Sequence, residues 1–284
     1  MTRLIAIDMD GTLLSRDHTI RIRNKEAILQ AKANGIEVII ATGRNFPEAY
    51  QIVTEQRLNP PFICLNGAEV RDESGKIISA TYLMEDDLKQ MLPILQAAGL
   101  EYELFIDQYI YTRDLERQID MFLLIAGAEK GTPAADKIRS EVLKRAEQGF
   151  IRTVPSYDEV FQKHHNEISK VLAASFHDEK LRKAKEKLQE FPGLAVSSSG
   201  PGNIEINHVN AQKGVALEQY AKSKGISMED VMVIGDNYND ISMMKRAGRA
   251  VAMGNAVDEI KAYCSHVTAT NEEDGVALAI EAVL

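Results

Sequence analysis

The sequence predicts an α/β fold: a doubly wound parallel sheet with an α+β region inserted into it. Short apolar runs are continuous rather than alternating, which is typical of parallel strands buried on both faces. Polar or glycine-bearing residues follow each run, and a helical pattern comes next. This order is interrupted from about residue 82 to residue 207 and then resumes, which indicates an insertion.

Five apolar runs are the expected strands of the parallel sheet: LIAI, EVIIA, FICL, VMVI and AVAM, at residues 4–7, 37–41, 62–65, 231–234 and 250–253. Helical patterns lie between them. Asn45 is a suitable N-cap for the second helix, and Gly35 is a suitable C′ residue for the first. Gly225 and Gly248 are expected to end two later helices. These elements together make a Rossmann-like, doubly wound core.

The inserted region shows more alternation, as in EYELFIDQYIYT and NIEINHV, and its helix DEKLRKAKEKLQEF is polar over much of its surface. We therefore expect a core of residues 1–83 and 208–284 and an α+β insert of residues 84–207. RDESGK and SSSGPGN have the composition of a hairpin turn and a loop. His164 and His165 lie beside charged residues and are expected to be exposed.

Composition narrows the functional classes. The chain has 284 residues with 45% apolar residues and a net charge of −9, which disfavours general nucleic-acid binding and leaves small anionic substrates open. Cys64 and Cys264 are expected to be buried free thiols, which fits a reducing compartment. No signal peptide is expected, because the first apolar run ends in acids. MFLLIAGA is far shorter than the ~20 residues of a membrane span, so we expect a soluble cytoplasmic protein.

Ligands of open α/β sheets bind beyond the carboxyl ends of the strands. Four of the expected strands are followed there by groups that bind oxygen anions or hard cations. Each group alone is compatible with an ordinary turn, but their combination indicates one site. The groups are Asp8, Asp10 and Thr12; Thr42, Gly43 and Arg44; Asn66 and Gly67; and Gly235, Asp236, Asn239 and Asp240.

The carboxylates of Asp8, Asp10 and Asp236 could surround one divalent cation. Oxygen ligands without histidine or cysteine favour Mg²⁺ over Zn²⁺. A calcium loop would need glycine at its sixth and glutamate at its twelfth position, where this chain has Leu13 and Thr19. These carboxylates therefore predict a magnesium site.

Lys213 supplies a positive charge in the first turn of an expected helix. A cation there opposes the helix dipole by roughly 0.3–1 kcal/mol. This placement is mildly costly unless an anion shares the site, so Lys213 is a candidate ligand of a phosphate group.

DMDGT, ATGR, the lysine and GDNYND together resemble the four motifs of the haloacid dehalogenase-like phosphohydrolases. NGAE, QKG, GDNYNDISMM, AVAMGNA and NEEDGVA resemble more narrowly the Cof-type subfamily, which includes the YidA-like sugar phosphatases. The resemblance covers about residues 1–83 and 208–284. It implies that the insert is a cap domain, which it matches mainly by position and length.

The resemblance implies a role for each motif residue. Asp8 would be the nucleophile that forms an aspartyl-phosphate, and Asp10 the general acid and base. Mg²⁺ would bind the carboxylates of Asp8 and Asp236 and the main-chain carbonyl of Asp10. Thr42 and Lys213 would stabilise the phosphoryl oxygens.

Less central roles are also expected. Further phosphate contacts would come from Met9, Gly11, Gly43 and Asn239. Thr12 and Asp240 would support the residues that bind metal and phosphate. Substrate contacts are expected from Arg44, Asn66, Gly67 and Glu205, the last of which alternates with isoleucines in NIEIN.

These roles imply a Mg²⁺-dependent phosphatase of small phosphorylated metabolites, such as sugar phosphates, with neither a nucleic acid nor a membrane as partner. Related ATPases carry threonine where Asp10 stands and hold their aspartyl-phosphate longer, so an acid here favours fast turnover. Two alternatives remain open at this point: a hexose phosphomutase on the same core, and a catalytically silent sensor of phosphorylated metabolites.

Overall fold

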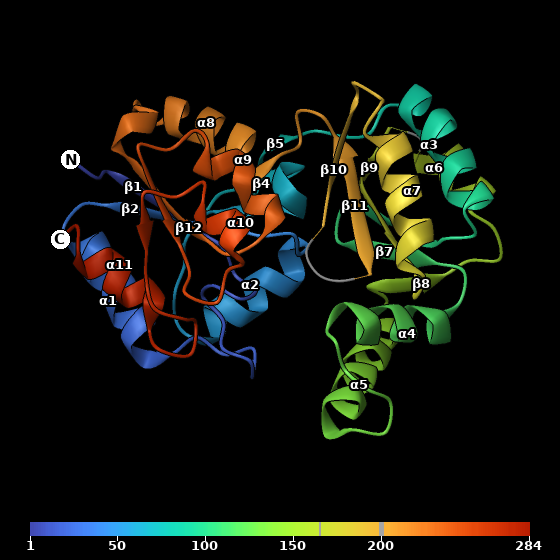
Figure 1. Ribbon diagram of the computed structural model, residues 1–284, viewed down its shortest axis with the longest axis horizontal. Helices are drawn as coiled ribbons and strands as arrows, with labels where there is room; N and C mark the ends of the chain where they lie inside the picture. The colour runs from blue at the N-terminus through green and yellow to red at the C-terminus, as the bar shows by residue number, and fades with distance from the viewer. Residues whose placement is uncertain (165, 199–201) are drawn as a thin grey trace. The chain divides into compact units, whose positions relative to one another are not determined.

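The fold is described from a computed structural model that covers residues 1–164, 166–198 and 202–284. The chain divides into two compact units (Figure 1). The core unit consists of Met1–Ala80 and Asn210–Leu284, and the inserted unit of Thr81–Val209. His165 and residues 199–201 of the expected SSSGPGN loop lie outside the described residues.

The described residues of the core unit form a sheet of eight strands in the order β14-β13-β12-β1-β2-β3-β4-β5. Neighbouring strands from β14 to β3 are parallel, and β4 and β5 are antiparallel additions. RDESGK joins β4 to β5, so the predicted hairpin turn is confirmed. The bounds are β1 Leu4–Ile7, β2 Glu37–Ala41, β3 Phe62–Cys64, β4 Glu69–Arg71, β5 Ile77–Ala80, β12 Val231–Gly235, β13 Arg249–Ala252 and β14 His266–Val267.

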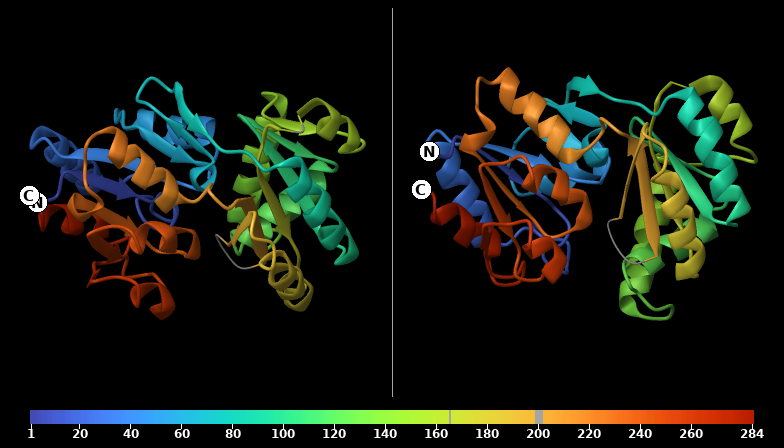
Figure 2. Two further views of the ribbon diagram at one scale, coloured as in Figure 1. Left: turned by 90° about the horizontal axis from the view of Figure 1, so that it is seen from above. Right: turned by 45° about the horizontal axis from the view of Figure 1, so that its top comes forward.

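Helices cover both faces of the core sheet, which confirms the predicted doubly wound α/β fold (Figures 1 and 2). All four residues of β1 are buried. Leu4 and Ala6 share a hydrophobic cluster with residues of α8 and α9, while α1 and α11 pack together on the other face. The bounds are α1 Ile22–Ala33, α2 Phe46–Glu55, α8 Lys213–Ser223, α9 Ile241–Met244, α10 Asp258–Lys261 and α11 Gly275–Glu281, with 3₁₀ turns η1 Leu65–Gly67, η2 Met228–Asp230 and η3 Tyr238–Asp240.

Three of the four predicted helix-end signals operate as expected, among them Gly225, which follows α8 with a φ of +65°, and one does not. Asn45 caps α2, since its Oδ1 accepts the N–H of Glu48 at 3.3 Å, and Gly35 follows α1 with a φ of +79°. The helix expected to reach Gly248 ends at Met244. A Cβ at Gly248 would lie 2.2 Å from the carbonyl oxygen of Glu229, so this glycine permits a close main-chain approach instead.

The described residues of the inserted unit form a sheet of six strands in the order β10-β11-β9-β6-β7-β8. One face of this sheet packs against α3 and α7 in a hydrophobic cluster that includes Leu104 and Ile206. Strand alternation places Lys170 and Glu205 on the other face. The bounds are β6 Glu101–Ile106, β7 Tyr109–Thr112, β8 Ile151–Thr153, β9 Ile168–Ala174, β10 Leu194–Ser197, β11 Asn203–His208, α3 Glu85–Ala97, α4 Leu115–Ile125, α5 Pro133–Glu147, α6 Asp158–His164 and α7 Asp178–Leu188.

Three smaller expectations can be compared with the structure. Cys64 is a buried free thiol, but Cys264 is only half-buried, because it lies in the turn after α10. His164 is not fully exposed as expected, since its side chain is 18% accessible and its Nδ1 lies 2.6 Å from Glu167. Among the described residues, no helix has both the length and the apolar character needed to cross a membrane.

Candidate active site

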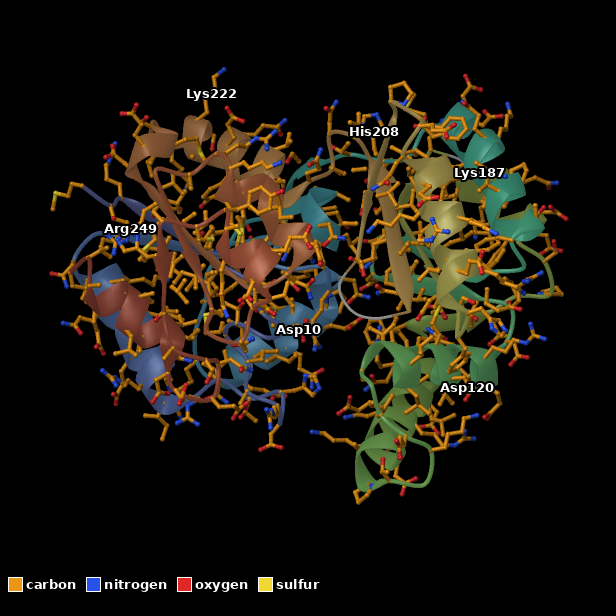
Figure 3. The ribbon with its side chains drawn as sticks, in the orientation of Figure 1. Asp10, Asp120, Lys187, His208, Lys222 and Arg249 are labelled. Carbon is orange, nitrogen blue, oxygen red and sulfur yellow. The ribbon has the colours of Figure 1, made fainter. Side chains whose placement is uncertain are left out.

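The four strands that were expected to carry the site are neighbours in the core sheet, in the order β12-β1-β2-β3. They are parallel, and Leu4 of β1 is in register with Val231 of β12 and Glu37 of β2. Their carboxyl ends therefore lie along the same edge of the sheet. Figure 3 shows Asp10 beyond this edge and Arg249, which begins β13, at the opposite end of the sheet.

Lys213 is buried at this edge between two carboxylates. Its Nζ lies 2.6 Å from Asp8 Oδ1 and 2.7 Å from Asp240 Oδ1, and its side chain is 0% accessible. Desolvation lowers the pKa of Lys213, but the attraction of the two carboxylates outweighs it and raises the pKa above its ordinary value. Lys213 is the first residue of α8, as predicted, and stays charged next to the carboxylate of Asp8.

The acids at this edge carry more negative charge than Lys213 can balance. Oxygen atoms of Asp8, Asp236 and Asp240 all lie within 4.8 Å of one another. Burial raises the pKa of Asp8 well above its usual range, and Asp240 raises it further, while Lys213 opposes both effects. Burial and Asp240 likewise raise the pKa of Asp236 to about 7, against the hydrogen bond from Thr12. Three carboxylates beside a single ammonium group have an excess of negative charge, and their oxygen atoms are suitable ligands of a divalent cation.

Asp240 uses both of its oxygens within the protein. Oδ1 is paired with Lys213, and Oδ2 accepts the main-chain N–H groups of Asp236 and Asn237, each at 3.0 Å. Asp240 thus fixes the turn after β12 and the ammonium group of Lys213 at the same time. This leaves Asp8 and Asp236 as the acids of the cluster with more freedom to bind a cation.

Gly11 allows the first loop to approach Asp236. Its φ is +78°, and a Cβ at this position would lie 2.4 Å from Asp236 Oδ2. Thr12, the next residue, donates its hydroxyl to Asp236 Oδ1 at 2.8 Å. The DMDGT loop and the turn after β12 are therefore joined directly, although 224 residues separate Thr12 from Asp236 in sequence.

Asp10 is paired with Arg44 rather than with the acid cluster. The guanidinium donates two hydrogen bonds to its carboxylate, at 2.8 and 2.6 Å, and 48% of the Asp10 side chain is accessible. Desolvation raises the pKa of Asp10, but the charge and hydrogen bonds of Arg44 outweigh it and lower the pKa. Asp10 is therefore ionised in this arrangement, the state in which it can accept a proton from water.

The loops after β2 and β3 contact each other through polar groups. Thr42 is buried, and its Oγ1 accepts the N–H of Arg44 at 3.1 Å, which leaves its own hydroxyl hydrogen to donate to an anion. Asn66 has a left-handed φ of 60°, and its N–H donates to the carbonyl of Thr42 at 3.0 Å. Such strained conformations are found at functional sites more often than elsewhere.

Asn239 connects this loop pair to the turn after β12. Its Nδ2 donates to Asn66 Oδ1 at 3.1 Å. Within the described part of the chain, Asn239 Oδ1 is buried without a hydrogen-bond partner. A buried acceptor without a partner costs about 1–3 kcal/mol. A hydroxyl or water bound at the site would satisfy it.

The remaining predicted residues lie as follows. The side chain of Met9 is fully buried in the core, so a contact with phosphate can come only from its main chain. Gly43 lies between Thr42 and Arg44 in the loop after β2, and Gly67 ends η1 after β3. Glu205 lies in the inserted unit, where its buried carboxylate is 2.9 Å from the Nζ of Lys170.

Two residues near this edge were not predicted from the sequence. His18 Nδ1 lies 3.4 Å from Nη2 of Arg44 and 3.9 Å from Oδ1 of Asp10. Asn255 donates from Nδ2 to the carbonyl of Gly11 at 2.8 Å. Asn255 follows β13, so the strand-end rule applied to the fifth predicted strand would have found it. No comparable signal marks His18.

A parallel sheet with paired acids, a threonine, a lysine and an acidic turn at one edge is an α/β fold with the groups needed to bind a cation and a phosphoryl group. The chain belongs to the haloacid dehalogenase-like hydrolases, whose family profile matches residues 5–280. It is a phosphatase of that superfamily, and the resemblance to its Cof-type members is confirmed.

Individual relatives match over nearly the whole chain. The 5-amino-6-(5-phospho-D-ribitylamino)uracil phosphatase YwtE of Bacillus subtilis is 35% identical over 99% of this chain and 98% of its own length. The pyridoxal phosphate phosphatase YbhA of Escherichia coli is 30% identical, over 97% and 96%. A solved haloacid dehalogenase-like hydrolase from B. subtilis superimposes with a TM-score of 0.87 at 31% identity and covers 100% of both chains.

Proposed function

We propose that this phosphatase hydrolyses small phosphorylated metabolites with Mg²⁺ through a phosphorylated Asp8. The observation that carries the proposal is the arrangement around Asp8. Its carboxylate is paired with a buried lysine at 2.6 Å and shares a cluster of oxygen atoms with Asp236 and Asp240. This arrangement gives a phosphoryl group a nucleophile, a fixed positive charge and a cation site within one small volume.

The reaction takes place in two steps. In the first, a carboxylate oxygen of Asp8 attacks phosphorus and the bond to the ester oxygen breaks, while Asp10 gives the leaving oxygen the proton that it took from water in the preceding turnover. In the second, Asp10 accepts a proton from water as that water attacks phosphorus. The bond from phosphorus to Asp8 then breaks, and phosphate is released with the carboxylate of Asp8 restored.

Residues around Asp8 hold the transferred group. Thr42 donates its free hydroxyl hydrogen to a phosphoryl oxygen, and Lys213 offsets the negative charge from within the protein. Asn239 and the main-chain N–H groups of Met9, Gly11 and Gly43 are the further donors that we assign to the phosphoryl oxygens. Thr12 and Asp240 keep their present contacts and so hold Asp236 and Lys213 in position.

The site fits the cation that the family implies, because buried carboxylates exceed the positive charge available to them. We assign its binding to the carboxylates of Asp8 and Asp236 and the main-chain carbonyl of Asp10. When bound, Mg²⁺ supplies charge that draws the phosphoryl oxygens and the carboxylate of Asp8 together.

Removal of divalent ions is expected to abolish turnover of p-nitrophenyl phosphate and to lower the melting temperature. The carboxylates of Asp8 and Asp236 then repel each other with only Lys213 to offset their charge. Dialysis against EDTA followed by titration with MgCl₂ should restore both quantities over the same concentration range. Zn²⁺ should restore turnover poorly, because this site offers only oxygen ligands. Full activity after exhaustive chelation would contradict the assignment.

The physiological substrate is proposed by class. The relatives named above act on phosphorylated ribitylaminouracil and on pyridoxal phosphate, and the resemblance implied sugar phosphates. We assign the choice among such metabolites to the inserted unit, within the predicted boundaries 84–207, and to Arg44, Asn66, Gly67 and Glu205. Phosphate release from a panel of these compounds and flavin mononucleotide, compared by kcat/KM, tests this assignment.

Asp10→Ala is expected to slow alkyl phosphates more than aryl phosphates. An alkoxide needs a proton to leave, whereas p-nitrophenolate does not. We expect kcat to fall by about 10²–10⁴-fold for glycerol phosphate and less for p-nitrophenyl phosphate. Steady-state kinetics with both substrates would show the difference. Equal losses would exclude a leaving-group acid and leave Asp10 as the base that activates water.

A further inference from the structure

The loop that carries both catalytic aspartates is held by two asparagines that the mechanism above does not use. Asn255 Nδ2 donates to the carbonyl of Gly11 at 2.8 Å, and its Oδ1 accepts the N–H of Asn271 at 3.1 Å. Asn271 Nδ2 in turn donates to the carbonyl of Leu14 at 2.8 Å. The three hydrogen bonds connect Gly11 to Leu14 through the AVAMGNA and NEEDGVA segments, which are distant in sequence.

Further hydrogen bonds fix the segments that carry Asn255 and Asn271. Gly254 donates its N–H to the carbonyl of Ala269 at 3.0 Å, and Thr268 donates its hydroxyl to the carbonyl of Gly275 at 2.7 Å. Glu272, the neighbour of Asn271, accepts the N–H of Arg16 at 2.7 Å. The segment from Thr268 to Gly275 is thus a brace that contacts the first loop at more than one point.

The position of Gly11 makes this brace relevant to the chemistry. Gly11 has a left-handed φ, and its peptide units join it to Asp10 on one side and Thr12 on the other. A bond to its carbonyl restricts how these peptide units can rotate, and with them the directions of the Asp10 carboxylate and of nearby N–H groups. A displacement of about 1 Å in a reacting group can cost roughly 10²-fold in rate.

We propose, on the basis of the phosphatase function above, that Asn255 and Asn271 are positioning residues for phosphoryl transfer. They act through the main chain of Gly11 and Leu14 and do not touch the phosphoryl group. Asn255 is exposed whereas Asn271 is buried. The bond from Asn271 therefore contributes more to folding, and the bond from Asn255 more to the geometry of Asp10.

The test is the effect of Asn255→Ala and Asn255→Asp on kinetics and stability. Asn255→Asp keeps an acceptor for Asn271 and removes the donor to Gly11. Both variants should lower kcat on p-nitrophenyl phosphate by about 10–100-fold, with KM within about threefold of the wild type. The melting temperature should change little. Asn34→Ala is the matched control, because its amide also donates to a main-chain carbonyl, that of Gln30 at 2.9 Å, on an exposed surface.

Other outcomes would overturn the inference. If kcat stays within twofold of the wild type, or if its fall equals the fall in folded protein, the asparagines are not positioning residues. Asn271→Ala provides a second arm, in which stability should fall more and the kcat of the folded fraction should fall as well. A wild-type protein inactive toward every phosphate ester would instead refute the proposed function, so the two failures are distinguishable.

Discussion

Asp8→Asn is expected to reduce phosphate release to the background rate, a loss of at least about 10³-fold in kcat. The amide has nearly the shape of the carboxylate but cannot attack phosphorus. Asn can still accept from Lys213, whose Nζ is 2.6 Å from Oδ1 in the wild type, so the fold should remain intact. Turnover of p-nitrophenyl phosphate and mass spectrometry of the rapidly quenched enzyme would measure the loss and the missing phosphorylated intermediate.

The same variant also tests how the Asp8 carboxyl group affects the stability of the fold. Burial raises the pKa of Asp8, so the folded chain binds a proton there more tightly than the unfolded chain does. The ionised carboxyl therefore destabilises the fold increasingly as the pH rises above the ordinary carboxyl range. In EDTA, Asp8→Asn should be more stable than the wild type, and the difference should grow as the pH rises from the ordinary carboxyl pKa to the raised pKa of Asp8 and stay constant above it. Urea unfolding at several pH values measures it.

Asp258→Asn serves as the control for both measurements. The Asp258 side chain is fully exposed and lies 3.8 Å from Lys261, so its substitution should change neither kcat nor the pH dependence of stability. Turnover that persists in Asp8→Asn would refute its role as nucleophile. A variant less stable than the wild type at every pH would show instead that the carboxylate is a net stabilising group.

Lys213→Met is expected to cost about 3–5 kcal/mol in the free energy of unfolding, because it leaves Asp8 and Asp240 buried without the lysine that both contact. It should also reduce kcat by about 10²–10³-fold through loss of a fixed charge near the phosphoryl group. Lys224→Met is the matched control. Lys224 is 42% accessible and pairs with Glu37 at 2.9 Å, so its loss should cost no more than about 1 kcal/mol.

A double variant keeps this prediction testable if Lys213→Met alone does not fold. Adding Asp240→Asn removes one of the two buried negative charges and retains an acceptor for the N–H groups of Asp236 and Asn237. The double variant should recover much of the lost stability, while kcat stays low. Recovery of kcat together with stability would show that Lys213 is needed only for folding.

Much of the core could be predicted because its strands and helix ends follow local rules. The five apolar runs correspond to β1, β2, β3, β12 and β13. A strand that is covered on both faces has a continuous apolar sequence, which can be recognised without knowing which strands pair with it. The end of α9 could not be predicted. Gly248 is required by the main chain of Glu229, and a contact of that kind is invisible in the local sequence.

Which residues belong to the site could be predicted better than which of them pair with one another. The strand-end rule brought Asp8, Thr42 and Asp236 to one edge of the sheet. It could not show that Asp10 would be paired with Arg44, because the pairing of two flexible side chains depends on where both loops lie in the folded chain. Nor could it show that Asp240 holds both Lys213 and the turn after β12.

The sheet order has a consequence for the order in which the protein can fold during synthesis. β1, which is followed directly by Asp8, lies between β2 and β12, so it stays an edge strand until residues 231–235 have left the ribosome. In the part of the chain that the structure describes, the strands of the inserted unit pair only with one another, and all of them are made before then. During this interval one edge of the apolar strand β1 is unpaired while the sheet of the inserted unit can already form, and unpaired strand edges of this kind are prone to aggregation.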